Sequence, residues 1–223
     1  MKKLLIILLA LALFNCTNDE DETIEKGFTQ FNSELSVLEN LDNGVAVLDI
    51  TEEIGVEAFY GLEYGGGFIF HVDETNGTIM VATEYADAGP TSWGDHFDLT
   101  NSEAIGAGLE NTQMVVDGNL SDNSMVPNGF EFGSDNYVFK IVSDLEYRTY
   151  DDWFVPSKGS MEAIFDNVHA QGFGNFDETK LYWTSTKVGY NPYVMSFNSN
   201  FFAGDCFLGS CFDSSAVLIV RAF

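Results

Sequence analysis

The chain has 223 residues and a formal charge of −26, from 9 Lys and Arg against 35 Asp and Glu. This balance excludes a basic nucleic-acid-binding protein as the first hypothesis, so we expect no nucleic-acid partner. Hydrophobic residues make up 45% of the chain and include 20 Phe, enough to form one sizeable core, which excludes disorder along the whole length. Three cysteines are too few for a small domain built on disulfides.

The N-terminus carries an export signal. Lys2 and Lys3 precede an apolar run from Leu4 to Phe14, which is too short to cross a hydrocarbon core of about 30 Å. Residues 1–15 are therefore predicted to be a secretory signal peptide. The run ends at Leu13-Phe14-Asn15-Cys16, which resembles the lipobox of bacterial lipoproteins, although Asn15 departs from the small residue usual there. This resemblance implies that Cys16 is diacylated and becomes the first residue of the mature protein.

An acidic segment follows the predicted lipidation site. Four acids occur in the six residues Thr17 to Glu22, and such a run stays solvated, so residues 16–26 are predicted to be a tether. The run also resembles the acidic export tag of surface lipoproteins in the Bacteroidetes group, and a plain flexible tether is the alternative. Two acyl chains give stable membrane anchoring. We therefore expect an outer-membrane lipoprotein at the cell surface.

Residues 27–58 are expected to form an accessory segment ahead of the main domain. Apolar residues spaced by three and four predict one short amphipathic helix in its first part. A strand is predicted after it, over Val45–Ile50. The apolar residues of the predicted helix are Phe28, Phe31, Leu35, Leu38 and Leu41.

The main domain, residues 59–223, is predicted to begin with a β-hairpin and continue with helices. Two β-rich runs, 68–72 and 78–83, flank a turn that ends in Asn76-Gly77, a pair that tolerates the positive φ of tight turns. Helical spacing then recurs three times, over 109–116, 138–145 with Asp135 as its cap, and 157–168 with Ser157 as its cap. In the last helix, Met161, Ile164, Phe165 and Val168 form one apolar stripe, which Gly172 ends.

Short β-like runs close the chain, over 181–185, 193–197 and 217–223. A hairpin first, helices in the middle and strands last predict an α+β fold with short antiparallel strands and two or three helices. Strands and helices do not alternate, so a doubly wound nucleotide-binding fold is not supported.

Motifs spread over about 160 of the 223 residues resemble those of one family, the lectin-like domain first named from the C-terminus of the Legionella collagen-like adhesin. They are GGGFIFHVDETNG at 65–77, SWG at 92–94, IGAGLENTQMVV at 105–116, DWFVPSK at 152–158, NVHAQG at 167–172, YWTST at 182–186 and VRAF at 220–223. The resemblance implies a single domain of the C-type-lectin-like superfamily, and a role in adhesion to polysaccharide or to a host surface.

Two features depart from that family. Residues 118–134 look like an insertion, and a surface loop there is a candidate for this chain's own specificity. The adhesin's preference for sulfated polysaccharide suits a basic surface, whereas this domain is strongly acidic and repels polyanions. The ligand class of the adhesin therefore does not carry over.

Catalytic residues are not evident. His71, His96 and His169 do not form a zinc motif such as HExxH, no GxSxG sequence is present, and His169 is expected to pack at a helix end. The formylglycine-generating oxygenases share a related fold and use a cysteine pair, but the context of Cys206 and Cys211 does not resemble theirs. In an exported protein this pair is predicted to form a disulfide, with free thiols as the alternative.

Calcium is the candidate cofactor. Acidic and amide residues cluster at 73–76, at 151–152 and in a predicted loop over 117–123, and oxygen ligands of this kind suit Ca²⁺. No cluster has the spacing of an EF-hand, and a solvated acidic face is the alternative. The predicted calcium ligands are Asp117, Asn119, Asp122 and Asn123.

Sugar binding needs an aromatic ring beside hydrogen-bonding groups. Trp153 and Trp183 lie in the family motifs and are expected in the core. The predicted exposed ligand-binding residues are Trp93, Tyr190, Tyr193 and Asn198. The sequence thus predicts a non-catalytic, surface-anchored binding or adhesion module for carbohydrate. The alternatives are a divergent formylglycine-generating-like enzyme and a structural subunit of a surface complex, in which residues 117–134 bind a surface protein.

Overall fold

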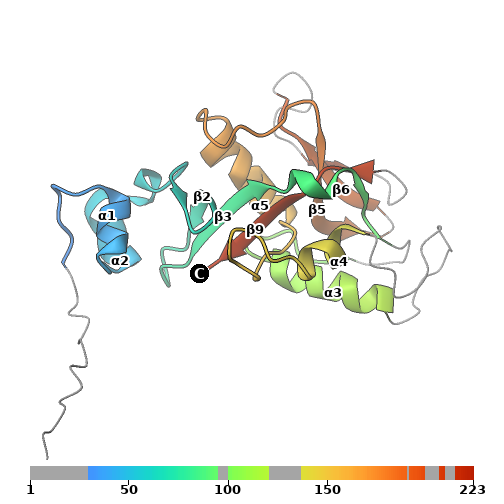
Figure 1. Ribbon diagram of the computed structural model, residues 1–223, viewed down its shortest axis with the longest axis horizontal. Coiled ribbons are helices and arrows are strands. Elements are labelled where there is room, and N and C mark those ends of the chain that lie inside the picture. Colours follow the sequence, from blue (N-terminus) through green and yellow to red (C-terminus); the bar gives the residue numbers. More distant parts are fainter. Residues whose placement is uncertain (1–29, 95–99, 121–136, 190, 199–205, 209–213) are drawn as a thin grey trace, which may run out of the picture.

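A computed structural model (Figure 1) describes residues 30–94, 100–120, 137–189, 191–198, 206–208 and 214–223. The helices are α1 (Val37–Asp42), α2 (Val47–Ile54), α3 (Gly108–Leu120), α4 (Val138–Ser143) and α5 (Lys158–Ile164), with short 3₁₀ turns η1 (Val56–Ala58) and η2 (Ala86–Ala88) and a π-helical turn η3 (Phe165–His169). The strands are β1 (Glu63–Tyr64), β2 (Gly67–Val72), β3 (Ile79–Glu84), β4 (Thr91–Ser92), β5 (Leu181–Val188), β6 (Asn191–Ser196), β7 (Cys206–Leu208), β8 (Ser214–Ser215) and β9 (Leu218–Ala222).

The strands form three small antiparallel sheets in the described part of the chain. Their orders are β1-β2-β3-β9, β4-β8 and β5-β6-β7. Helices α3, α4 and α5 accompany them in residues 59–223, so the predicted α+β fold with short antiparallel strands is confirmed. None of the described helices is long and apolar enough to span a bilayer.

The predicted hairpin is the centre of the larger sheet. Strand β2 pairs with β3, and a β-bulge between Ile69 and His71 shifts the register. Gly77 has φ of 76°, the left-handed conformation that the turn requires, and the Asp73 carboxylate accepts the backbone N–H of Thr75 at 2.8 Å. The C-terminal strand β9 pairs along the other edge of β3, from Leu218 opposite Glu84 to Ala222 opposite Met80.

Both faces of this sheet are buried, because helices cover each of them (Figure 1). On one face, Ile69 and Val81 join a cluster with Val37 and Ile50 of the accessory segment. On the other face, Phe70, Ala82 and Val220 pack against Met161 and Ile164 of α5. The accessory segment is therefore packed onto the sheet and does not hang free of it.

A third cluster joins α3 and α4 to the remaining strands. Val115 and Phe139 meet Trp183 of β5 and Ile219 of β9, and Trp153 lies beside them, 3% exposed. Trp153 and Trp183 are thus core residues, as predicted. The Asp135 cap expected for α4 lies outside the described residues, and Tyr137 occupies the N-cap position without a side-chain cap.

The strand predicted over Val45–Ile50 is wrong, because the chain forms α2 there. A six-residue run that is apolar except for Asp49 fits a strand and a buried helix turn equally well, and the residues beyond it decide between the two. Val47 and Ile50, three apart, turn inward, while Leu48 is 37% exposed. Thr51, Glu52 and Glu53 extend this helical pattern beyond the apolar run, to Ile54.

Helix α5 begins as predicted, with the Ser157 hydroxyl accepting the backbone N–H of Ser160 at 3.2 Å. Its apolar stripe is buried at Met161, Ile164 and Val168. The last turn widens into the π-helical turn η3, which ends near Gly172, with φ of 84°. π-Helical turns are rare and are frequent at functional sites.

Arg221 of β9 ties three distant segments together. Its Nε and Nη2 donate to the two carboxylate oxygens of Asp152 at 2.6 and 2.9 Å, and its Nη1 donates to the carbonyl of Gly65 at 3.0 Å. The guanidinium lies 3.7 Å from the centre of the Tyr150 ring and 4.5 Å from that of Phe223. Planar, bidentate and stacked contacts of this kind are specific to arginine.

We expect Arg221→Lys to lower the free energy of unfolding by about 1–3 kcal/mol, because lysine replaces the bidentate contact with a single donor and loses the stacking. Urea denaturation measures this. Arg148→Lys is the matched control, since Arg148 also donates to a turn carbonyl, that of Gly66, but pairs with exposed Glu63 at 3.4 Å. Equal losses in the two variants would contradict the special role of Arg221.

Candidate functional site

The structure corrects one predicted ligand-binding residue. Trp93 is fully buried rather than exposed, and its Nε1 donates to the carbonyl of Thr184 at 2.9 Å. Its ring meets Phe139 edge-on with 4.7 Å between centres. The residues around Trp93 were predicted to form a loop, which suggested that the indole is exposed. The indole instead lies in the core, where its hydrogen-bond acceptor, the Thr184 carbonyl, is 91 residues away in the sequence. Trp93 is a core residue and cannot contact a ligand at the surface.

The other predicted sugar contacts do not gather in one place. Tyr193 is half-buried under the ammonium group of Lys158, 5.4 Å from the ring centre. Asn198 is half-buried, and its backbone N–H donates to the Ser196 hydroxyl. Neither lines the three hollows described below. Tyr190 lies outside the described residues.

The predicted calcium site is only partly described. Helix α3 continues through Asn119 to Leu120, so Asp117 lies in a helix rather than in the expected loop. The Asp117 carboxylate accepts the side-chain N–H of Gln113 at 2.9 Å. Asp122 and Asn123 lie outside the described residues. Within the described ranges, no three His, Cys, Asp or Glu side chains gather as a metal site.

The reactive residues fall into two groups. Cys16 and Cys211, the side chain of Cys206, and His96 all lie outside what the structure describes. His169 is described and packs as predicted at the helix end, with its ring 5.1 Å from Phe197 and 5.5 Å from Phe165. The remaining histidine, His71, lies in β2, and burial lowers its pKa.

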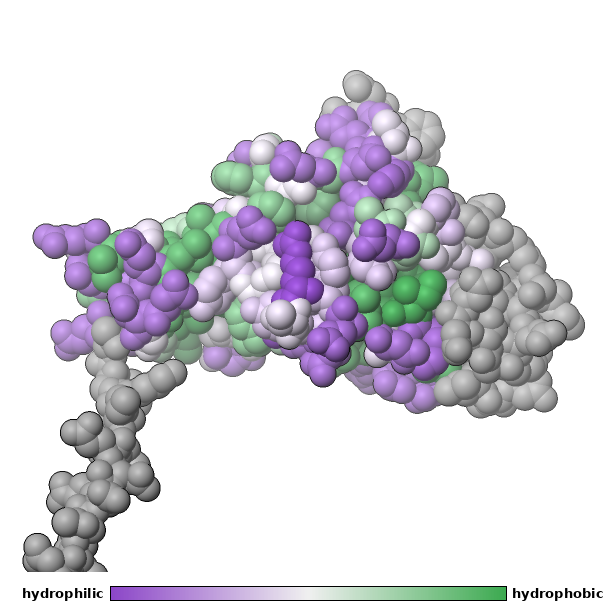
Figure 2. Space-filling view, in the orientation of Figure 1, coloured by the Kyte–Doolittle hydropathy of each residue, from purple (hydrophilic) through white to green (hydrophobic). Residues whose placement is uncertain are grey.

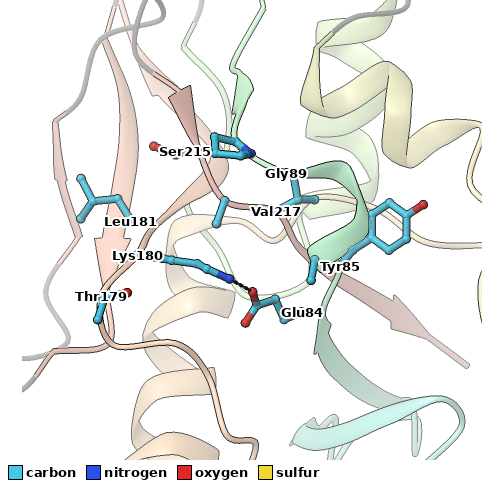
Figure 3. Close-up of a pocket in the computed structure, with 11 residues that line it drawn as sticks. Glu84, Tyr85, Gly89, Thr179, Lys180, Leu181, Ser215 and Val217 are labelled. Carbon is cyan, nitrogen blue, oxygen red and sulfur yellow. Dashed lines mark hydrogen bonds and ion pairs between the residues drawn. The ribbon is translucent and has the colours of Figure 1, made fainter.

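One hollow, the Glu84 pocket, lies between the end of β3 and the start of β5 (Figure 3) and has a volume of about 450 Å³. Lys180 reaches across it to form an ion pair with Glu84, while the Tyr85 ring points away from that pair. The lining residues are Glu84, Tyr85, Ala86, Gly89, Pro90, Thr179, Lys180, Leu181, Ser215, Ala216 and Val217.

The polar groups of the Glu84 pocket bind one another. The Tyr182 hydroxyl donates to Glu84 at 2.9 Å, and Lys180 also lies 3.4 Å from Asp177. Burial and this hydrogen bond to Glu84 raise the pKa of Tyr182, and the hydrogen bond to Glu84 raises the pKa of Lys180. Both shifts hold these groups protonated at neutral pH, so neither group becomes a base or nucleophile.

A second hollow, named here the Phe173 groove, offers different chemistry. It has a volume of about 670 Å³. Glu57 and Tyr60 line it from one part of the chain, and residues of η3 and of the turn after η3 line it from another. Its lining combines two aromatic rings with two amides and one carboxylate. These residues are Glu57, Tyr60, Asn167, Gln171 and Phe173.

The Phe173 side chain is exposed and packs against the backbone on one side. It is 46% exposed, and its backbone N–H donates to the carbonyl of Val168 at 2.9 Å. The ring lies so close to Gly61 that a Cβ atom at position 61 would be 2.1 Å from it. The Phe173 ring therefore rests against the Gly61 backbone while much of the residue stays open to a ligand.

Polar atoms in the Phe173 groove keep hydrogen-bonding capacity. The Asn167 amide donates to the carbonyl of Phe70 at 3.0 Å and that of Gln171 to the carbonyl of Asp166 at 3.2 Å, which leaves both side-chain oxygens without a partner in the described part of the chain. Burial and the nearby carboxylate of Glu57 raise the pKa of Tyr60, so its hydroxyl remains a donor. The groove thus presents donors and acceptors beside an aromatic face.

A third hollow, the His169 hollow, shares Phe173 with the groove and has a volume of about 430 Å³. The imidazole Nε2 of His169 lies 3.6 Å from a carboxylate oxygen of Glu178, and Asn175 has a positive φ of 48°. The residues that line this hollow are His169, Gly172, Phe173, Asn175, Phe176 and Glu178.

Across the described ranges, every Lys and Arg is already engaged with a partner. Five form ion pairs, which are Lys140–Asp144, Arg148–Glu63, Lys158–Glu103, Lys180–Glu84 and Arg221–Asp152. Lys187 is fully buried, with its ammonium group 4.9 Å from the centre of the Trp93 ring. Hydrophilic side chains cover much of the face in Figure 2, with separate hydrophobic areas between them. An anionic ligand would have to displace an existing partner.

Sequence reasoning did not find the Phe173 groove. One local signal was available, because Phe173 is a large apolar residue between Gly172 and Gly174, both with φ of 84°. The contribution of Tyr60 had no such signal, since Tyr60 lines the groove together with residues more than 100 positions away in the sequence.

A scan against protein-family models finds no match to the chain, and no curated protein is significantly similar to it.

The hydrogen bonds between Asp177 and Thr179, beside the Glu84 pocket, predict how the stability of the fold depends on pH. Hydrogen bonds from the side chain and backbone of Thr179 lower the pKa of Asp177 below its ordinary value of 3.8. A lowered pKa in the folded state contributes stability above the unfolded-state value, and this stability is lost as pH falls through the folded value. We expect Thr179→Val to raise the pKa of Asp177, as measured by NMR titration, so that this stability is lost at a higher pH.

Thr75→Val is the matched control, because Thr75 makes the same two hydrogen bonds to Asp73 in an identical Asp-Glu-Thr sequence. This control is expected to raise the pKa of Asp73 and leave that of Asp177 unchanged. An unchanged Asp177 pKa in Thr179→Val would show that the hydroxyl does not set it.

Proposed function

We propose that this chain is a surface-anchored, non-catalytic module that binds neutral polysaccharide in the Phe173 groove. The observation that carries the proposal is the exposed Phe173 ring, packed against Gly61, beside side-chain oxygens of Asn167 and Gln171 that have no partner among the described residues. One face of a pyranose ring is apolar and stacks on an aromatic ring, while its hydroxyls need fixed donors and acceptors. The resemblance to lectin-like domains favours the same function.

Existing contacts of the groove residues support binding by stacking. A ring that already packs against the protein loses less side-chain freedom when a ligand arrives, which lowers the entropic cost of binding. The amides of Asn167 and Gln171 each donate to a backbone carbonyl, which orients them. Oriented polar groups can distinguish the positions of hydroxyls on a sugar.

Charge supports a neutral ligand. Neither Lys nor Arg lines the Phe173 groove, and Glu57 adds a negative charge to it. The chain as a whole carries a net charge of −26, which repels sulfated or uronic polymers. Stacking and hydrogen bonding remain as the favourable terms, and both suit uncharged sugars.

The anchoring part of the proposal is supported by the N-terminal sequence alone. An apolar run of signal-peptide length ends at Cys16, and an acidic tether follows. A diacylated cysteine would hold the domain at the outer membrane, with the tether between the lipid and the first packed helix.

An enzyme is less well supported. Of the three hollows described above, the Glu84 pocket has the most ionisable groups, and Lys180 and the neighbouring Tyr182 are both held protonated there. The rival oxygenase hypothesis rests on Cys206 and Cys211, and no observation on the described residues favours it.

We expect Phe173→Ala to weaken binding of neutral polysaccharide by about tenfold or more, because the stacking surface is lost. Affinity electrophoresis of the full-length protein in detergent, through gels containing dextran, mannan or starch, measures the retention. Leu109→Ala is the control, since Leu109 is 61% exposed on α3 and away from the groove.

The counterpart measurement uses dextran sulfate, which we expect to retain the protein less than dextran does. Retention by none of the three neutral polymers would overturn the proposed function, as would equal retention of wild type and Phe173→Ala. Stronger retention by dextran sulfate would contradict the argument from charge.

We expect Cys16→Ser to move the protein from the membrane fraction to the soluble fraction of expressing bacteria, because the acylated thiol is lost. Fractionation and mass spectrometry of the N-terminal peptide measure the change. An unacylated wild-type peptide, or a Cys16→Ser protein that stays with the membrane, would overturn the lipid anchor.

A further inference from the structure

We propose that the site binds an internal stretch of a polysaccharide chain, with sugar units in the Phe173 groove and in the His169 hollow at the same time. This inference rests on the proposed function and extends it, because it distinguishes binding along a chain from binding of a single terminal sugar. It is carried by the arrangement of two hollows around one exposed aromatic residue.

The two hollows are lined by one segment. Asn167 and Gln171 line the groove, while His169 and Gly172 line the other hollow. These residues alternate between the two hollows along the π-helical turn η3 and the turn that follows it. The segment therefore lies between the hollows, and Phe173 borders both.

The ridge between the hollows is low and exposed. Ala170, Gln171 and Gly172 are all exposed, and two of the three have no side chain beyond Cβ. Gly172 also has φ of 84°, a conformation that disfavours a larger residue there. A chain that crosses between the hollows at Ala170 or Gly172 therefore meets a small residue, while the Gln171 side chain lines the groove beside it.

The second hollow repeats the chemistry of the first. The Glu178 carboxylate is 56% exposed, and its 3.6 Å separation from His169 is longer than a hydrogen bond, so both groups keep capacity for a ligand. Phe173 supplies the exposed aromatic surface, Phe176 lines the hollow from the core, and Asn175 is exposed. Each hollow contains one carboxylate and lacks Lys and Arg, so both favour neutral sugars.

Volume supports occupation of both hollows. At about 670 and 430 Å³, each lies in the range of small-ligand sites, so a single sugar fills only one of them. Sugars linked in one chain bind the second hollow at a high effective concentration, and affinity then exceeds that of either unit alone.

The test measures affinity against chain length. Isothermal titration of the full-length protein uses gluco-, manno- and xylo-oligosaccharides of one to six units. We expect the hexamer of the bound series to bind at least about tenfold more tightly than its monomer. A monomer that binds as tightly as its hexamer would overturn the two-hollow inference and leave the proposed function standing. Binding of no oligosaccharide and of no neutral polysaccharide would overturn the proposed function itself.

Two variants separate the hollows without threatening the fold. Tyr60→Phe removes one hydroxyl from the groove, and Asn175→Gly removes one amide from the His169 hollow at a position whose φ of 48° glycine adopts readily. We expect each to lower hexamer affinity, while Leu109→Ala does not. An unchanged hexamer affinity in Asn175→Gly, with a loss in Tyr60→Phe, would show that only the groove binds sugar and would overturn the inference.

Discussion

Arg221 is the contact on which the main sheet and its surroundings depend. Its guanidinium binds Asp152, which precedes α5 and is 69 residues away in the sequence. It also binds the carbonyl of Gly65, which lies in the turn between β1 and β2 and is 156 residues away. Glycine is required at Gly65, because a Cβ atom there would lie 2.3 Å from the Phe223 ring. These contacts of Arg221 hold the residues just before β2 close to the residues ahead of α5. The elements that pack on β2 are therefore positioned relative to α5 as well.

The Phe173 groove is one consequence of this arrangement. Its two walls approach from opposite faces of the sheet, since the accessory segment covers one face and α5 the other. Asn167 is anchored on the carbonyl of Phe70 in β2, and Phe173 rests on Gly61, which itself donates a backbone N–H to Ile69 of the same strand. The accessory segment therefore takes part in the groove, through Glu57.

The sequence predicted correctly those features that depend on interactions between residues close together in the chain. The Asn76-Gly77 turn and the Ser157 cap each involve contacts within a few residues, and both were predicted correctly. Val45–Ile50 failed because a short apolar run does not distinguish strand from helix. Trp93 failed because its partner is 91 residues away. The groove escaped prediction for the same reason, since Tyr60 and Asn167 line one hollow although they are 107 residues apart in the sequence.

The ion pairs show how the acidic composition determines the charge of the protein surface. Because the described cations are already engaged, the excess of carboxylates is left as an unbalanced negative surface. Such a surface keeps the domain soluble and repels other polyanions, including anionic headgroups of the membrane to which the chain is proposed to be anchored. Repulsion of this kind holds the domain away from the bilayer. It also leaves stacking and hydrogen bonding, which salt screens little, as the forces available for recognition at the Phe173 groove.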